Sequence, residues 1–321
     1  MNLAFLCPGQ GAQSPGFLRR LPPHAEVERT LDEASRVLQR DVRRLDGALE
    51  LRSTVAAQLS IVIAGVALAR ALDAQGLRPD AVAGLSVGAF TAAVIVGSLA
   101  FDQALRIVLL RATLMERAYP KGYGMAVIVG LGQRSVEDIL RSAAPAGATA
   151  EQQVYLANFN GPAQFVIAGA DAALEQALRD ARNLGVRRAE RLDVAVPSHC
   201  VLLAGVAQAL RDALLACPVQ APRVPYVGNR SGRLLGSAEA IAADLADNVM
   251  APVRWHDGTT VLYEHGVRQF IELPPGQTLA QLAQAAFESV RAVSTEGADL
   301  HSLVLGARRF QTNMEEGRNR T

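Results

Sequence analysis

Lysine is almost absent from this chain: Lys121 is the single lysine among 32 basic residues. A phosphate-binding P-loop needs a Gly-Lys-Ser/Thr sequence, and a Schiff-base enzyme needs a reactive lysine. Lys121 lies in the turn-like stretch Tyr119-Pro-Lys-Gly-Tyr-Gly, which suits neither role. The sequence therefore argues against both classes of protein.

Cysteine is also scarce and unclustered, at positions 7, 200 and 217. This spacing fits neither a disulfide framework nor a Cys-x-x-Cys metal site. No group of His, Cys, Asp and Glu has the spacing of metal ligands, so we expect no metal site and no permanently bound cofactor.

Charge and hydropathy exclude further classes. The net charge of +1 lacks the basic footprint of a nucleic-acid binder. The N-terminus has no basic segment before its apolar run, and the most apolar stretch, Leu59 to Leu72, is interrupted by Arg70. We expect neither a signal peptide nor a membrane span, and hence a cytoplasmic protein.

Half of the 321 residues are apolar, which is enough to form a large hydrophobic core. The strand-like Asp80 to Gly84, a tight turn at Ser86 and the helical run Ala89 to Leu99 form a βα unit of a parallel sheet. Leu59 to Leu72 predicts a mostly buried helix.

The pattern changes at Gly124. The following stretch predicts strand, helix, two paired strands, helix and strand, at Met125–Gly130, Ser135–Ala143, Val154–Asn158, Gln164–Ala168, Ala172–Leu184 and Ala189–Val196. That order is typical of a ferredoxin-like fold. We therefore predict an α/β catalytic domain, residues 1–123 and 197–321, with a ferredoxin-like domain, 124–196, inserted. The polar end, Met314 to Thr321, is expected to fray.

Gly84-Leu-Ser86-Val-Gly88 matches the nucleophile-elbow pattern Gly-x-Ser-x-Gly in its required strand-to-helix context. Such a turn places the serine oxygen at a helix N-terminus, where negative charge is stabilised. The alternative is an ordinary glycine-containing turn. Among the five histidines, His199 is the best-placed base, because it follows a predicted buried strand, although a structural histidine is the alternative.

Arg111 lies on a predicted helix among apolar i±3 and i±4 neighbours, at Ile107, Val108, Leu114 and Met115. Its guanidinium therefore points into the interior, where an unpaired charge is costly. The sequence leaves two readings open: an internal salt bridge, or a clamp for a substrate carboxylate. The glycine-rich turn Pro8 to Gln13 has the wrong spacing for a dinucleotide site, but its backbone N–H groups suit an oxyanion.

Several motifs follow one another along nearly the whole chain: Pro8-Gly-Gln-Gly-Ala-Gln13, Gly84-Leu-Ser-Val-Gly88, Arg111 with Met115, Gly122-Tyr-Gly-Met-Ala-Val, Asn158-Phe-Asn160, Ile167-Ala-Gly169, Val196-Pro-Ser-His-Cys200 and Pro252-Val-Arg-Trp255. As a set they resemble the malonyl-CoA:acyl carrier protein transacylase family. The resemblance implies an α/β-hydrolase-like large domain with a ferredoxin-like insert, and malonyl-CoA as the donor substrate.

The resemblance also implies roles for individual residues. Ser86 would be the nucleophile and His199 its general base. Arg111 would pair with the malonyl carboxylate, and Gln58 and Asn160 would line the substrate pocket. The N–H groups of Gln10 and Val87 would form the oxyanion hole. The backbone carbonyl of Arg254 would help to orient the histidine.

Two departures point to a particular branch. The familiar fatty-acid enzymes read Gly-His-Ser-Leu-Gly at the elbow, where this chain has Leu85 and Val87, and they commonly carry Gln at the position of Arg254. Together with Leu21-Pro-Pro and Pro274-Pro-Gly276, this combination looks more like the transacylase (epsilon) subunit of malonate decarboxylase. In that system the acceptor is a small carrier subunit with a CoA-derived prosthetic arm, and the other subunits would be partners. The alternatives are a malonyl-CoA:acyl carrier protein transacylase of fatty-acid synthesis, a serine thioesterase or hydrolase of the same fold, and a non-catalytic scaffold.

Overall fold

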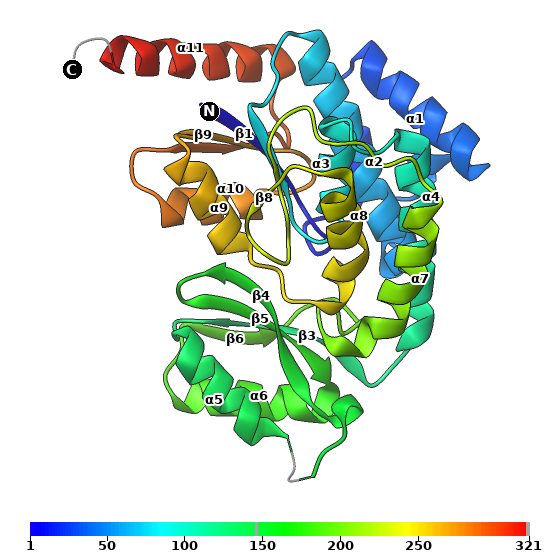
Figure 1. Ribbon diagram of the computed structural model, residues 1–321, viewed down its shortest axis with the longest axis vertical. Helices are drawn as coiled ribbons and strands as arrows, with labels where there is room; N and C mark the ends of the chain where they lie inside the picture. The colour runs from blue at the N-terminus through cyan, green and yellow to red at the C-terminus, as the bar shows by residue number, and fades with distance from the viewer. Residues whose placement is uncertain (145–146, 319–321) are drawn as a thin grey trace.

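Two separate β-sheets organise the chain in the computed structural model, which describes residues 1–144 and 147–318 (Figure 1). The larger sheet has the order β10-β9-β1-β2-β7-β8. Its strands are β1 (Leu3–Cys7), β2 (Ala81–Gly84), β7 (Tyr226–Val227), β8 (Leu234–Leu235), β9 (Gln269–Glu272) and β10 (Arg291–Ser294). Neighbouring strands run parallel from β10 to β7, and β8 pairs antiparallel with β7.

Helices surround this sheet. They are α1 (Ala25–Leu38), α2 (Thr54–Ala74), α3 (Gly88–Ile95), α4 (Phe101–Ala118), α7 (Ala204–Leu215), α8 (Ala238–Asp247), α9 (Trp255–Glu264), α10 (Thr278–Ala286) and α11 (Leu300–Arg318). All five residues of β1 are buried, because apolar side chains cover the sheet on both faces.

Helix α2 is long and apolar enough to cross a membrane by length and composition, yet 89% of its apolar window is buried inside the protein. It is therefore the central core helix, and the prediction of a mostly buried helix here is confirmed. The helix begins earlier than predicted because the Ser53 side chain caps it, accepting a hydrogen bond from the N–H of Val55.

The smaller sheet, at the bottom of Figure 1, has the order β4-β5-β3-β6 with antiparallel neighbours. It contains β3 (Tyr123–Val129), β4 (Val154–Gly161), β5 (Gln164–Ala170) and β6 (Arg188–Arg191), with α5 (Gln133–Ala143) and α6 (Asp171–Asn183). The α/β architecture with a parallel sheet and a ferredoxin-like second sheet is thus confirmed. The predicted domain boundaries stay a prediction.

Alternation along β3 assigns the two faces of this sheet. Ala126 and Ile128 pack against α5 and α6, whereas Met125 and Val127 point to the opposite side, toward the larger sheet. The small sheet therefore presents its second face to a cleft between the two sheets.

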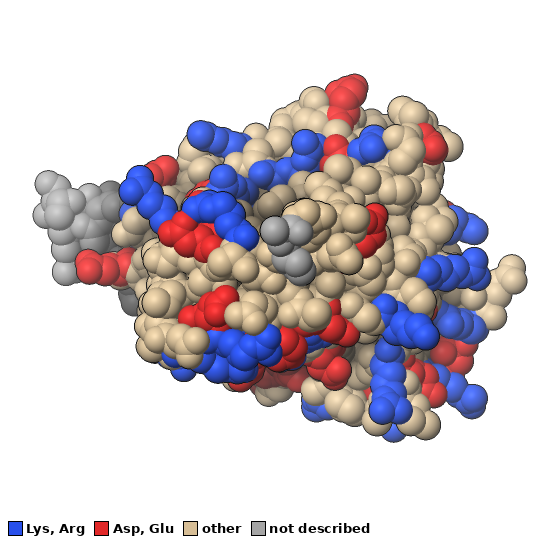
Figure 2. Space-filling model, turned by 90° about the horizontal axis from the view of Figure 1, so that it is seen from below, with Lys and Arg blue, Asp and Glu red and all other residues tan. Residues whose placement is uncertain are grey.

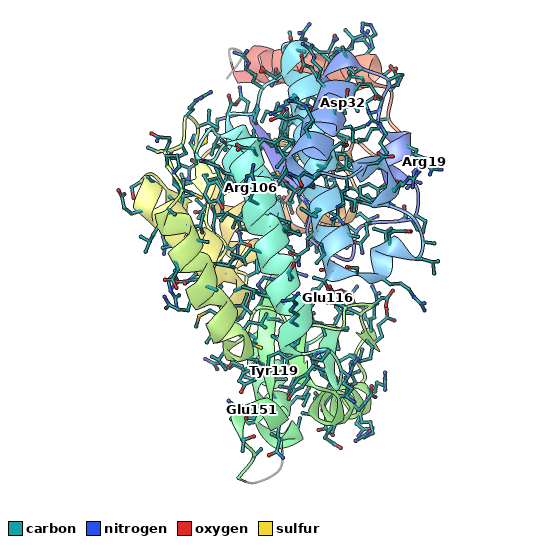
Figure 3. All side chains as sticks on the ribbon, turned by 90° about the vertical axis from the view of Figure 1, so that its right-hand side faces the viewer. Arg19, Asp32, Arg106, Glu116, Tyr119 and Glu151 are labelled. Atoms are coloured by element: carbon teal, nitrogen blue, oxygen red, sulfur yellow. The ribbon has the colours of Figure 1, made fainter. Side chains whose placement is uncertain are left out.

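Two connections fix the small sheet to the rest of the protein. Helix α4 ends at Ala118, and the chain continues through Tyr119 to Tyr123, the first residue of β3 in the small sheet (Figure 3). In addition, β4 forms a short parallel bridge with the segment before α9: the N–H of Phe159 donates to the carbonyl of Val253, and the N–H of Val253 donates to the carbonyl of Ala157, both at 2.8 Å. Backbone hydrogen bonds therefore join β4 of the small sheet to the segment before α9.

Several predicted bounds differ from the structure. The helix expected to reach Leu99 ends at Ile95, because Gly97 adopts a left-handed φ of 75°. The strand expected to reach Val196 ends at Arg191, and an irregular segment returns the chain to the cleft. The end expected to fray belongs to α11 as far as Arg318, and residues 319–321 lie outside the described part of the chain.

Charges of both signs are interspersed on the face formed by the small sheet and its surroundings (Figure 2). This agrees with the net charge of +1.

Candidate active site

Ser86 occupies the sharp turn between β2 and α3. It has a positive φ of 56°, which is unfavourable for a residue with a side chain and turns its hydroxyl out of the strand end. The glycines on either side are required by close backbone approach. A Cβ at Gly84 would collide with the carbonyl of Gly88, and one at Gly88 would collide with the carbonyl of Cys7. The turn is therefore built as the sequence pattern predicts.

His199 faces Ser86 across the cleft. Its Nε2 lies 2.8 Å from Ser86 Oγ, and its Nδ1 lies 2.6 Å from the carbonyl oxygen of Asn248. Because a carbonyl only accepts, Nδ1 carries the proton and Nε2 is free to accept one from the serine. Burial, with the nearby charge of Arg111 as a second cause, lowers the pKa of His199 to about 4, so the ring is neutral at pH 7.

Arg111 lies behind the serine with no exposed surface. Its Nη2 donates to Ser86 Oγ at 3.1 Å, and its Nη1 donates to Gln58 Oε1 at 2.6 Å. Among the residues described, no Asp or Glu forms an ion pair with it, which removes the internal salt bridge left open by the sequence. Burial lowers its pKa to about 9, which still leaves the guanidinium charged at neutral pH.

A cavity of about 270 Å³ opens over the serine, between the two sheets. Ser86, His199 and Gln58 line it, together with side chains of the small sheet. Arg111 does not line it, but its two donors contact residues that do: Nη2 donates to the Ser86 hydroxyl and Nη1 donates to Gln58. The guanidinium is therefore separated from the cavity by a single layer of side chains.

The two backbone groups expected to hold an oxyanion lie beside this cavity. Gln10 lines it, and Val87 follows the serine at the start of α3. Within the described ranges, the N–H groups of Gln10 and Val87 donate no hydrogen bond to another protein group. Both donors are available for a developing negative charge on a substrate oxygen.

Gln58 and Asn160 also reach the cleft. Gln58 Nε2 lies 3.3 Å from Gln10 Oε1, so this side chain links the glycine-rich turn to Arg111. The side-chain oxygens of Asn158 and Asn160, on β4, are buried and lack a hydrogen-bond partner within the described residues, and both residues line the cavity. These oxygens are acceptors available to a donor on a bound substrate.

Two expectations need correction. The carbonyl of Arg254 accepts from the N–H of Gly258, and its guanidinium stacks on the Phe159 ring at 4.3 Å. The carbonyl that orients His199 is that of Asn248, which the sequence analysis missed because it looked like the plain end of a helix. His199 also does not end a buried strand; it lies in the irregular segment after β6, with a positive φ of 65°.

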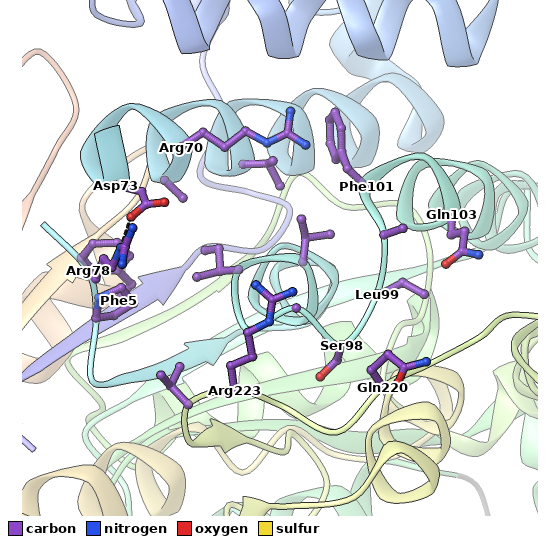
Figure 4. Close-up of a pocket in the computed structure, with 18 of the residues that line it drawn as sticks. Phe5, Arg70, Asp73, Arg78, Ser98, Leu99, Phe101, Gln103, Gln220 and Arg223 are labelled. Atoms are coloured by element: carbon purple, nitrogen blue, oxygen red, sulfur yellow. Dashed lines mark hydrogen bonds and ion pairs between the residues drawn. The ribbon is translucent and has the colours of Figure 1, made fainter. Parts of the chain in front are cut away.

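A larger cavity, of about 790 Å³, lies elsewhere, between the end of α2 and the loop joining α3 to α4 (Figure 4). Arg70, Arg78 and Arg223 border it. Arg70 is already paired with Glu33, and Arg78 with Asp73. None of Ser86, His199 and Arg111 lines it, so cavity volume alone would not have located the candidate active site.

The geometry can be compared with known proteins. Residues 4–316 match the family described as "Acyl transferase domain". A malonyl CoA-acyl carrier protein transacylase of Escherichia coli K12 is 35% identical over 297 residues, covering 91% of this chain and 94% of that protein.

Solved structures are similar over nearly the full length. The acyl-carrier-protein S-malonyltransferase of Burkholderia pseudomallei 1710b is 36% identical, with a TM-score of 0.88, covering 95% of this chain and 99% of that one. A malonyl-transacylase solved in complex with its type II PKS acyl-carrier protein is 34% identical, with a TM-score of 0.89 and coverage of 95% and 100%. Because the family match spans residues 4–316 and these relatives are 34–36% identical over more than 90% of both chains, this chain belongs to the acyl transferase family.

Proposed function

We propose that this protein transfers a malonyl group from CoA to the thiol of a carrier-protein arm, through an ester on Ser86. The observation that carries the proposal is the fully buried, charged Arg111, whose Nη2 lies 3.1 Å from the nucleophile's oxygen. A cation held there without an acidic partner among the described residues suits a donor that brings its own carboxylate. The names of the relatives support this substrate.

In the first half-reaction, Ser86 Oγ attacks the thioester carbonyl while His199 Nε2 takes its proton. The negative charge that develops on the carbonyl oxygen is stabilised by the N–H groups of Gln10 and Val87. The carbon–sulfur bond then breaks, His199 gives its proton to the leaving sulfur, and CoA departs as the free thiol, which leaves His199 neutral again. The product is a malonyl ester on Ser86, with its carboxylate on Arg111.

In the second half-reaction, the carrier's thiol replaces CoA. His199 takes the thiol proton, the thiolate attacks the ester, and the serine oxygen regains the proton as it leaves. A hydrolase of the same architecture would use water here, but a general thioesterase has no need of a carboxylate-reading cation. Arg111 therefore favours transfer of a malonyl group over hydrolysis of simple acyl groups.

For the acceptor, we propose an acyl carrier protein, as in the fatty-acid alternative. The similar proteins are named acyl carrier protein transacylases, and one was solved with a type II PKS acyl-carrier protein. Priming of malonate decarboxylase is the interpretation preferred from the sequence. It rests on Leu85, Val87 and Arg254 with Leu21-Pro-Pro and Pro274-Pro-Gly276, and these relatives do not support it. A cytoplasmic location remains part of the proposal.

Incubation with malonyl-CoA followed by intact-mass measurement tests the reaction. We expect a malonyl adduct on the wild-type protein that disappears in Ser86→Ala. Absence of the adduct from the folded wild-type protein would reject the proposal.

The acceptor is tested by offering the malonyl-enzyme two carriers in separate reactions. One is an acyl carrier protein of fatty-acid synthesis, and the other is the carrier subunit of malonate decarboxylase with its CoA-derived arm. We expect faster transfer to the first. Faster transfer to the second would restore the decarboxylase assignment, and rapid release of free malonate would favour a hydrolase.

A further inference from the structure

The side chain of Asn229 forms two hydrogen bonds to the backbone of the nucleophile turn, one to Gly84 and one to Ser86. Its Oδ1 accepts a hydrogen bond from the N–H of Ser86 at 2.8 Å, and its Nδ2 donates to the carbonyl of Gly84 at 2.7 Å. Asn229 is 4% exposed. A single buried amide group therefore satisfies one backbone donor and one backbone acceptor of the elbow.

The position of Asn229 explains why a side chain is needed here. The parallel pairing of β2 with β7 ends at Ala83 and Val227, one residue before Gly84. Beyond that point the chain turns at Ser86 with a φ of 56°, so a straight neighbouring strand cannot follow it. The planar amide of Asn229 supplies the hydrogen bonds that a continuing strand would have made.

The opposite side of the elbow is held by β1, where the N–H of Leu85 donates to the carbonyl of Cys7 at 2.9 Å. The Leu85 side chain itself offers no hydrogen-bonding group. Polar support for the serine on the β7 side thus comes from Asn229.

Asn229 is itself held in place by hydrogen bonds to its own backbone N–H and carbonyl groups. Its N–H donates to the buried carboxylate of Asp244, on α8, at 2.9 Å, and the same carboxylate accepts from the N–H of Arg230 at 3.0 Å. The carbonyl of Asn229 accepts from the N–H of Arg254 at 2.7 Å. The amide that contacts the elbow therefore has a fixed position and orientation.

We propose that Asn229 is a positioning residue for the nucleophile. It holds Ser86 in its unfavourable backbone conformation, which keeps the serine oxygen 2.8 Å from His199 Nε2 and the N–H of Val87 free. The inference rests on the proposed function in one respect, since it takes Ser86 to be the residue that is acylated.

Two variants and a matched control test this role. Asn229→Ala removes both hydrogen bonds, whereas Arg230→Ala alters the next residue, whose side chain pairs at the surface with Asp247. The rate of Ser86 labelling by a fluorophosphonate is measured beside the rate of malonyl transfer, with circular dichroism as the check of folding. We expect both rates to fall roughly 10- to 100-fold in Asn229→Ala, because misplacing a reacting group by about an ångström has effects of that size. Arg230→Ala is expected to label at the wild-type rate.

Asn229→Asp gives a readout that a purely structural asparagine would not give. An ionised carboxylate still accepts from the N–H of Ser86 but cannot donate to the carbonyl of Gly84. A protonated carboxyl group can do both. We therefore expect the ratio of variant to wild-type labelling rate to rise as the pH is lowered from 8 to 5.5, whereas His199 stays neutral over that range because its pKa is about 4.

The outcomes are distinct. A folded Asn229→Ala protein that labels at the wild-type rate overturns the inference. If that variant does not fold, the Asn229→Asp ratio decides, and a ratio independent of pH overturns it. A wild-type protein that labels with the fluorophosphonate but takes no malonyl group refutes the proposed function alone, and the labelling rates still test Asn229.

Discussion

Replacing Arg111 by methionine should greatly reduce the preference for a malonyl donor while leaving the elbow in place. The guanidinium is fully buried, and burial lowers its pKa from 12.5 to about 9. That shift corresponds to roughly 5 kcal/mol of cost for keeping the charge in the interior. A donor carboxylate that pairs with Nη2 recovers part of this cost, and an acetyl group recovers none.

The size of the effect follows from this balance. Recovery of about 3–4 kcal/mol corresponds to a preference for malonyl-CoA over acetyl-CoA of roughly 100- to 1000-fold. In Arg111→Met the side chain keeps a similar length without the charge, so we expect the preference to fall below about tenfold, mainly through loss of malonyl transfer.

The assay compares kcat/KM for Ser86 acylation by the two donors, measured by rapid quenching and intact mass. Arg106→Met is the matched control, since Arg106 is an exposed residue on the same helix (Figure 3). If Arg111→Met slowed both donors by the same factor, the reasoning would be refuted, because a purely structural role would not distinguish them.

Three further variants or conditions test the site. Glu272 lines the same cavity, and burial raises its pKa to about 7, so the pH series is run on Glu272→Gln. In that variant the acylation rate should stay constant from pH 8 to about pH 5 and halve near pH 4 in rapid-quench measurements, because His199 has a pKa of about 4 and acts as a base only when neutral; halving near pH 6.5 would contradict this. Gln58→Glu places a carboxylate against Arg111, where it pairs with the guanidinium in place of the donor's carboxylate. We expect kcat/KM for malonyl-CoA to fall about tenfold or more and the melting temperature to rise. An unchanged kcat/KM would exclude Arg111 as the group that binds the malonyl carboxylate. Gly88→Ala forces a Cβ onto the carbonyl of Cys7. We expect the free energy of unfolding in a urea titration to fall by about 1–3 kcal/mol and the rate of Ser86 labelling by the fluorophosphonate to fall as well. Wild-type stability would show that the turn has room to adjust.

Much of the fold could be predicted from the sequence because its signals are local. The elbow needs glycines within four residues of the serine, and their spacing is visible in the chain. The ferredoxin-like order was readable because each of its elements has its own hydrophobic period. The helices α1 and α11 were not predicted; α1 nevertheless has a local amphipathic pattern, with Val27, Leu31 and Ala34 buried along one side, and this signal was overlooked.

The burial of Arg111 could also be predicted from local sequence. Its i±3 and i±4 neighbours are apolar, and helical periodicity alone turned the side chain inward. Periodicity could not say what the guanidinium meets there. The structure brings Gln58, on α2, and Ser86, in the turn before α3, to the guanidinium, and no described Asp or Glu pairs with it, which excludes the internal salt bridge.

Only the tertiary structure shows which residues hold Ser86 and His199 in place. Asn248 meets His199 from 49 residues away, and Asn229 meets Ser86 from 143 residues away. Both contacts are made by loops and helix ends, which carry no periodic signal, and one of them uses a backbone carbonyl that any residue type possesses. The sequence therefore identified the candidate serine and histidine, whose proposed chemistry requires particular side chains, whereas the packing of distant segments determined which neighbours hold them 2.8 Å apart.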